Sequence, residues 1–190
     1  AEKMAGVRVD QVIGAVSGAR PVSWGFTGDA EVMSGEVTDQ DVAAALAACP
    51  EPPAEEGREI LHALPVNFTL DQTSFLSDPR GMTGQNLSVD MHILSVASAP
   101  LRNLARCVRR CDLELAGVVT APYSSGLSSL VEDEQELGAA CIDMGGGSTG
   151  VSIFMKKHMI YADTVRMGGD HVTGDISMGL GVPMAKAEWI

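Results

Sequence analysis

The sequence is poor in aromatic residues and in positive charge. Only 4% of its 190 residues are Phe, Trp or Tyr, so a buried core has to be built from aliphatic side chains and methionine. Lys and Arg number 13 against 25 Asp and Glu, which gives a formal net charge of −12. Proteins that bind nucleic acid concentrate basic residues on one face. We therefore expect no nucleic-acid partner, although at 45% hydrophobic residues the chain can bury a core.

One basic cluster departs from this acidic background. It lies at helical spacing and contains Arg102, Arg106, Arg109 and Arg110. Arginines with that spacing most often form the solvated face of an amphipathic helix, and we predict such a face here.

Cysteine is also scarce, and its spacing fits neither a disulfide framework nor a strong metal site. The four cysteines are Cys49, Cys107, Cys111 and Cys141. Cys107 and Cys111 are one helical turn apart, which suits a weak metal pair but more often reflects half-buried helix packing. Unpaired cysteines favour a reducing, cytoplasmic setting.

Long apolar runs are missing as well. No run approaches the roughly 18 residues that a membrane-spanning helix needs, and no signal peptide is visible. The chain begins "AEKMAGVRVD" without an initiator Met and ends "PMAKAEWI", as a helix in its first turns. These two features predict a fragment of a longer protein.

The first third of the chain mixes strands with one well-marked helix. Residues 7–16 are apolar and β-branched and predict a buried strand that ends at Ser17-Gly18. Residues 22–37 read as short strand material around glycine turns. Thr38 then precedes an alanine-rich helix, with Asp41 at the reciprocal position of a capping-box variant. An acidic, Pro-rich loop ends that helix.

Two strands follow that are predicted to pair. Residues 58–72 form the first, in which Pro65 marks an edge or a bulge. Residues 85–98 form the second, with alternate apolar side chains from Leu87 to Ile93 on one face. His62 and His92 lie in these strands, and we interpret them as satisfied strand residues rather than ligands, since no third ligand is evident.

The second half alternates helices and strands. A helix begins near Pro100, a short buried strand follows at 115–121, and Pro122 opens a helix of small residues that continues to about 136. Residues 138–167 predict three consecutive strands. Gly168-Gly169 leads into a helix with an apolar residue at every fourth position. The order predicts an α/β protein with a small inserted α+β block of strand, helix, strand and strand.

The glycine run in "CIDMGGGSTG", residues 141–150, is the first candidate site. Three glycines after a strand free the backbone to expose consecutive N–H groups to an anion, and Ser148 and Thr149 add hydroxyls. Asp143, at the end of the strand, suits a hydrated Mg²⁺ held through water better than direct contact with phosphate. The glycines are Gly145, Gly146 and Gly147. The pattern matches neither the dinucleotide fingerprint nor the P-loop, and a plain glycine-rich hairpin turn is the alternative.

A second glycine pair strengthens the phosphate interpretation. Gly168 and Gly169 open a helix, and amides at a helix N-terminus can face the same anion. Two glycine turns that flank a three-stranded meander are typical of the phosphate-binding half of the actin and Hsp70-like ATPase fold. We therefore expect ATP and Mg²⁺ as ligands.

A series of blocks in fixed order carries a family resemblance. The blocks are "AVSG" (15–18), "GEVTDQDV" (35–42), "EILHALPVNFTLD" (59–71), "DPRGMTG" (78–84), "VDMHIL" (89–94), "VRRCDLELAGVV" (108–119), "SSGLSSLVEDEQELGAACIDMGGGS" (124–148) and "GGDHVTGDIS" (168–177). Over nearly its whole length the chain resembles the FtsA family of actin-like bacterial cell-division proteins.

The resemblance implies a two-lobed ATP-binding fold, of which this chain is a part. Residues 1–20 and 98–137 would belong to subdomain IA, 21–97 to the inserted SHS2-type subdomain IC, and 138–190 to the first part of subdomain IIA. The family's second phosphate loop falls on Asp143 and Gly145–Ser148, and a later nucleotide-facing turn falls on Gly168 and Gly169.

Two positions depart from the pattern of relatives. Gly150 stands where many relatives carry an acid, which puts metal or water positioning there in doubt. Ala121 stands where Hsp70-like relatives place a Glu that orients the attacking water. Loss of such general-base help lowers a rate by about 10²–10⁴-fold. The resemblance thus implies slow ATPase turnover or nucleotide-gated assembly.

The resemblance further implies an adaptor of the division ring. Such a protein forms filaments by self-association, binds the tubulin-like FtsZ, recruits later division proteins through IC, and attaches to the inner membrane through a C-terminal amphipathic helix. The FtsZ-binding part and the membrane helix match nothing in these residues. The expected location is the cytoplasmic face of the inner membrane at the division site.

Two rivals stay open from the sequence. A type IV pilus assembly protein of the PilM type shares the actin-like fold and a related insertion. A small-molecule kinase of the same superfamily would need a catalytic carboxylate near the cleft and a substrate pocket, and residues 121–130 offer neither.

Overall fold

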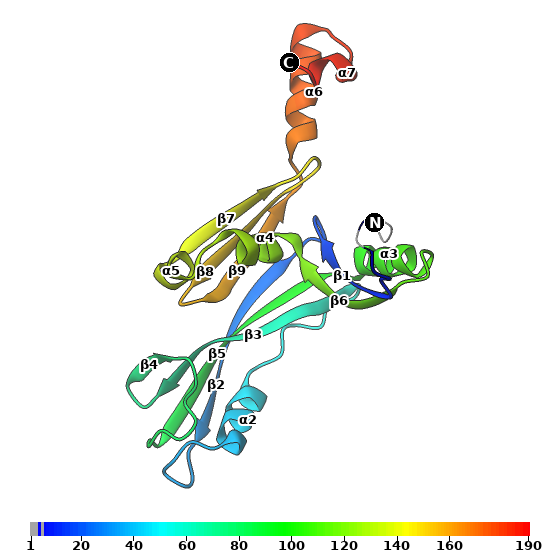
Figure 1. Cartoon of the computed structure of the whole chain (residues 1–190). Helices are drawn as coiled ribbons and strands as arrows, with labels where there is room; N and C mark the ends of the chain where they lie inside the picture. The colour runs from blue at the N-terminus through cyan, green and yellow to red at the C-terminus, as the bar shows by residue number, and fades with distance from the viewer. Residues whose placement is uncertain (1–3, 5) are drawn as a thin grey trace.

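The strands of the molecule form three sheets (Figure 1), in a computed structural model that describes residue 4 and residues 6–190. The first is a parallel pair of β1 (Gln11–Val16) and β6 (Glu114–Thr120). The second is antiparallel, in the order β2 (Val22–Glu31), β5 (Asn86–Ala97), β3 (Arg58–Leu70) and β4 (Thr73–Leu76). The third is an antiparallel meander of β7 (Ala139–Met144), β8 (Thr149–Met155) and β9 (His158–Val165).

The helices lie between and beside these sheets. They are α2 (Asp39–Ala48), α3 (Ser98–Arg109), α4 (Ala121–Ser129), α5 (Glu132–Leu137), α6 (Gly169–Leu180) and α7 (Met184–Ala187). Figure 1 shows α6 and α7 projecting from the end of the meander, away from the other elements. Among the described residues, no helix is both long and apolar enough to cross a bilayer.

The parallel pair is less buried than the sequence predicts. β1 begins at Gln11, and Ile13 in its middle is 75% exposed. The covered face lies under α3, where Leu104 sits directly against Gly14. The expected arginine face is confirmed, because all four arginines of 102–110 are exposed. Half-buried packing of Cys107 and Cys111 is wrong, since both are exposed.

The inserted block contains strand, helix, strand and strand, as predicted, with the short β4 added at its edge. β2 is one regular strand rather than short pieces around turns, because its glycines stay within the ladder to β5. Gly28 is needed there for a close approach, since a Cβ would collide with the carbonyl of Ala45 on α2. The Pro65 bulge is confirmed by a register shift between Pro65 and Asn67.

The predicted capping box of α2 is present. The Thr38 hydroxyl accepts a bond from the Asp41 amide, and the Asp41 carboxylate accepts one from the Thr38 amide at 2.8 Å. Both orphan donors at this helix end are therefore satisfied. The Thr38 hydroxyl, which donates to the Asp41 carboxylate at 2.6 Å, and then the Thr38 amide lower the pKa of Asp41 below its ordinary value.

β5 is the central strand of the molecule, and both of its faces are covered. Leu87 and Val89 on the predicted apolar face pack with α2 in one core. Leu94 packs instead with Phe154 of the meander, and Val96 packs with Val16 of the parallel pair. One strand thus joins the inserted block to both neighbouring sheets.

The meander forms where the sequence predicts three strands, and its β8–β9 turn places Lys156 and Lys157 at positive φ. The single helix predicted from Pro122 is wrong, because the chain is extended at Leu130 and Val131 and divides it into α4 and α5. Glu134 accepts a bond from the Val131 amide, which starts the new helix without a Ser or Thr cap. Gly126 of α4 lies against the Phe154 ring, so the small residues of α4 serve close packing on β8.

A candidate phosphate-binding site

The glycine loop of residues 145–148 joins β7 to β8 and is stiffened by one internal bond. The amide of Gly145 donates to the carbonyl of Ser148 at 2.9 Å. Within the described residues, the amides of Gly146, Gly147 and Ser148 donate to no acceptor. Three consecutive free donors at an exposed tip form an arrangement that binds anions.

The second glycine turn contacts this loop directly. The amides of Gly169 and Asp170 donate to the carbonyls of Gly145 and Gly146 at 3.0 and 2.9 Å. A Cβ at Gly168 would collide with both of those carbonyls, so only glycine permits the contact. The structure therefore brings the two predicted glycine turns together, but it uses the first helix amides of α6 to hold the loop. Gly168 and Gly169 act here as a brace for the cradle.

Thr149 belongs to the same brace. Its hydroxyl donates to the carbonyl of Met167 at 2.7 Å and fixes the start of β8 to the end of β9. The hydroxyl of Ser148 makes no hydrogen bond within the described residues and lies near Gly18, which follows β1. Of the two predicted hydroxyls, Ser148 is the one available to a ligand.

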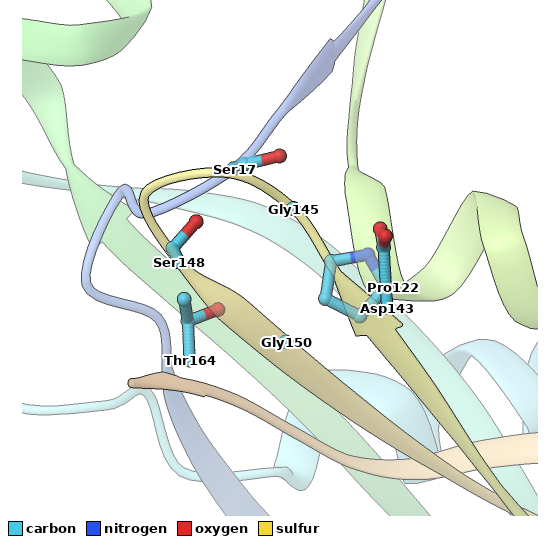
Figure 2. Close-up of a pocket in the computed structure, with 7 residues that line it drawn as sticks. All are labelled: Ser17, Pro122, Asp143, Gly145, Ser148, Gly150 and Thr164. Carbon is cyan, nitrogen blue, oxygen red and sulfur yellow. The ribbon is translucent and has the colours of Figure 1, made fainter. Parts of the chain in front are cut away.

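A small cavity of about 20 Å³ opens beside the loop, room for one water molecule (Figure 2). Its walls come from four separate stretches of the chain and consist of Ser17, Pro122, Asp143, Gly145, Ser148, Gly150 and Thr164. Figure 2 shows Ser17 and Ser148 at the loop and Asp143 beside Pro122. Hydroxyls and a carboxylate thus face a space next to the free amides.

Asp143 lies at the end of β7, and the hydroxyl of Ser125 donates to its carboxylate at 3.0 Å. Within the described part of the chain, no three metal-ligating side chains gather. Mg²⁺ usually keeps several waters and takes one or two carboxylates together with ligand phosphates. A single oriented carboxylate beside an anion cradle fits that mode of binding. Burial, and after it the charge of Asp143, raise the pKa of the nearby Cys141 thiol.

A second carboxylate approaches the cradle from α6. An added Cβ at Gly146 would lie 3.1 Å from a carboxylate oxygen of Asp170. Asp170 is the second residue of α6, where the helix dipole favours negative charge. The loop therefore carries acid on both sides, from Asp143 and Asp170, which suits a phosphate only when a cation accompanies it.

The structure explains why position 150 is a glycine, but it does not explain the alanine at position 121. A Cβ at Gly150 would collide with the ring of Pro122, so an acid at 150 is incompatible with this wall of the cavity. Ala121 is the first residue of α4 and precedes that ring. Nothing in the structure explains why position 121 itself lacks a carboxylate.

Sequence reasoning missed four residues of the site: Ser17, Ser125, Thr164 and Asp170. Ser17 directly follows β1 and is far from the loop in the sequence, so no local pattern marks it, whereas Thr164 on β9 is the cross-strand partner of Gly150 and depends on the register of the meander. Ser125 lies in the small-residue helix α4, and that composition was the available signal. Asp170 directly follows Gly168-Gly169, so the glycine pair was a signal from which it could have been predicted.

Two protein-family models match parts of this chain. The family model described as "SHS2 domain inserted in FTSA" matches residues 18–95, and "Cell division protein FtsA" matches 140–190. The chain belongs to the FtsA family. The Cell division protein FtsA of Agrobacterium fabrum is 42% identical over 188 residues, 99% of this chain and 42% of that protein. The one from Pseudomonas aeruginosa is 32% identical over 100% of this chain and 46% of its own length.

The FtsA relatives are thus more than twice as long as this chain. A solved structure, "PilM-PilN type IV pilus biogenesis complex", matches 98% of this chain and 52% of its own chain with a TM-score of 0.63 at 14% identity. At that identity the match shows the fold alone. The actin-like fold is confirmed, and the sequence matches favour FtsA over the PilM alternative.

Proposed function

We propose that this chain is the part of an FtsA-type cell-division protein that binds the phosphates of ATP with Mg²⁺. The observation that carries the proposal is the loop tip with three free amides, at Gly146, Gly147 and Ser148. Amides of this kind bind a phosphate through consecutive N–H groups. The membership of the chain in an actin-like family supports ATP as the source of that phosphate.

Each predicted site residue has a place in this proposal. Gly145 to Ser148 form the cradle, Thr149 fixes its start to β9, and Gly168-Gly169 brace it through carbonyls 145 and 146. Asp143 would hold Mg²⁺ through water, and Mg²⁺ would supply the positive charge that the acidic surroundings lack.

Hydrolysis in this site is proposed to be slow. A general base has to lie within hydrogen-bond reach of the attacking water. Ala121 supplies no carboxylate, and Asp143 is bonded to Ser125. The site is better suited to hold ATP than to consume it, so nucleotide binding would license assembly of the protein.

The partners of the whole protein follow from the family and are proposals here. We propose self-association into filaments, attachment to FtsZ and to the inner membrane through parts outside this chain, and recruitment of later division proteins through residues 21–97. The proposed location is the cytoplasmic face of the membrane at the division site. Sedimentation of the chain with and without MgATP tests nucleotide-dependent self-association.

The phosphate site is tested by Gly146→Asp. The new side chain would enter the cradle beside Asp170 and add a like charge to the phosphate's neighbourhood. We expect MgATP to shift the amide NMR signals of residues 146–148 in the native chain. In the variant the affinity falls at least about tenfold, since one unit charge in the cradle costs more than 1.4 kcal/mol.

Gly174→Asp is the matched control. It adds the same charge to α6 at a position where a Cβ meets no atom within 4 Å. We expect unchanged affinity there. Equal affinity of native chain and Gly146→Asp would remove the loop from the site.

A further inference from the structure

The Ser23 hydroxyl forms a polar contact between the inserted block and the meander. Ser23 near the start of β2 donates to the carbonyl of Ala162 on β9 at 2.9 Å and accepts from the amide of Ala162 at 3.0 Å. The Ser23 side chain thus takes the place that a neighbouring strand would have along this edge of β9. Ala162 is 1% exposed, so water does not satisfy these backbone groups if the contact breaks.

His92 on β5 orients that hydroxyl. Its Nε2 lies 3.0 Å from Ser23 Oγ, and the ring is 3% exposed. The only hydroxyl proton of Ser23 goes to the Ala162 carbonyl, so His92 Nε2 has to be the donor. Nδ1 is then a bare acceptor, and it has no partner among the described residues. Burial lowers the pKa of His92, and a backbone group of Met159 acts in the opposite direction.

On the other side of Ala162 the contacts continue toward the candidate site. Ala162 pairs with Ser152 of β8, and the fully buried Ser152 hydroxyl donates to the Pro122 carbonyl at 2.7 Å. The Pro122 ring lies against Gly150, and both residues line the cavity beside Asp143. An unbroken series of buried contacts therefore runs from β5 to the cavity wall.

We propose that this series, which we call the Ser23 link (His92, Ser23, Ala162, Ser152 and Pro122), couples the inserted block to the phosphate loop. Ser23 positions β9 relative to β2, because its hydroxyl bonds both backbone groups of Ala162. Because one hydroxyl bonds both backbone groups of Ala162, the contact has two discrete states, made or broken, and a shift of β9 breaks both bonds together. A two-state element of this kind is what energetic coupling between sites requires. The inference rests on the proposed function for its biological role, but the link itself is independent of nucleotide.

A second contact between the same two parts provides a control. Lys156 at the β8–β9 turn lies 5.9 Å from the centre of the Phe75 ring of β4 and forms an ion pair with Glu136. These groups are all partly open to solvent, so the contact is weak and screened. Loss of Lys156 should therefore leave the coupling intact.

The first measurement needs no nucleotide. Amide hydrogen exchange of the whole chain is compared for native protein, Ser23→Ala, Ser23→Thr and Lys156→Ala. We expect exchange of the Ala162 amide to become roughly fivefold to tenfold faster in Ser23→Ala and to return toward native in Ser23→Thr, which keeps the hydroxyl. Lys156→Ala leaves it unchanged. Native-like exchange at Ala162 in Ser23→Ala would overturn the link.

The second measurement tests coupling from the cavity end. Ser152→Ala removes the bond to Pro122, and we expect it to shift the His92 ring signals in the native background but not in Ser23→Ala. Pro122→Ala, which removes the ring that lies against Gly150, is the second variant if Ser152→Ala unfolds the chain. Equal shifts in both backgrounds would overturn coupling through Ser23. MgATP added to native chain should alter exchange in β2 and β5. If residues 146–148 show no response to MgATP, the proposed function fails, while the two variant series still decide on the link.

Discussion

The inserted sheet and the meander are both antiparallel, but they differ in how much of their apolar surface is covered. The inserted sheet closes a core of its own against α2, in which Ala45, Leu87 and Val89 are fully buried. The meander buries one face against α4 and β5, whereas Ile142 and Met144 on β7 are 67% and 70% exposed. In α6 every residue is at least partly exposed. The inserted block therefore has a hydrophobic core of its own, whereas the core of the meander includes residues of β5 and α4.

The largest expected loss of stability is at the contact between Phe154 of the meander and Leu94 of β5. Phe154→Ala removes a fully buried ring that packs with Leu94 of β5 and with Tyr123 of α4. We expect a loss of about 3–5 kcal/mol in the free energy of unfolding, measured with urea. Because the ring joins two sheets, exchange should rise in β5 as well as in β7–β9. A rise confined to the meander would contradict this comparison.

The inserted core should respond locally. Leu87→Ala leaves a cavity under α2, with an expected cost of about 2–5 kcal/mol. We expect exchange to rise within residues 22–97 and to stay native-like in residues 139–165. Equal destabilisation of both regions would show that the block is not self-contained.

The α2 cap is a smaller contribution with a pH signature. Thr38→Ala should cost about 1 kcal/mol of unfolding free energy, since it removes an N-cap side chain. The pKa of Asp41 is lowered in the fold by Thr38, so its contribution is complete above its ordinary pKa of 3.8 and is lost as pH falls through the folded value. The free energy of unfolding, measured with urea between pH 6 and pH 2.5, should therefore decrease less with falling pH in Thr38→Ala than in the native chain.

The smallest effect is expected on the open face of the meander. Ile142→Ser changes a side chain that is already 67% exposed, and we expect a change within about 0.5 kcal/mol. A loss above about 1.5 kcal/mol in the urea midpoint analysis would mean that this face is covered in solution.

Local patterns in the sequence predicted the local structure well. The alternation in β5, the Thr38 cap and the glycine loop each follow from neighbouring residues. What the sequence did not reveal depends on distant contacts. The amides of Gly169 and Asp170 bond loop carbonyls rather than facing open space, and Ser17 reaches the cavity only because the end of β1 meets the meander there. α5 begins separately from α4 because the Glu134 carboxylate accepts a bond from the Val131 amide. Valine is not a residue that helix-capping motifs include, so the sequence did not mark this helix start.

The contact between Gly150 and Pro122 also constrains how this sequence can change. A side chain at 150 has no room while the proline ring is present, and a smaller residue at 122 would create that room. The two positions are therefore epistatic: a substitution that is damaging at one of them becomes tolerable after a change at the other. A change that introduces an acid at 150 therefore requires a change at position 122 as well.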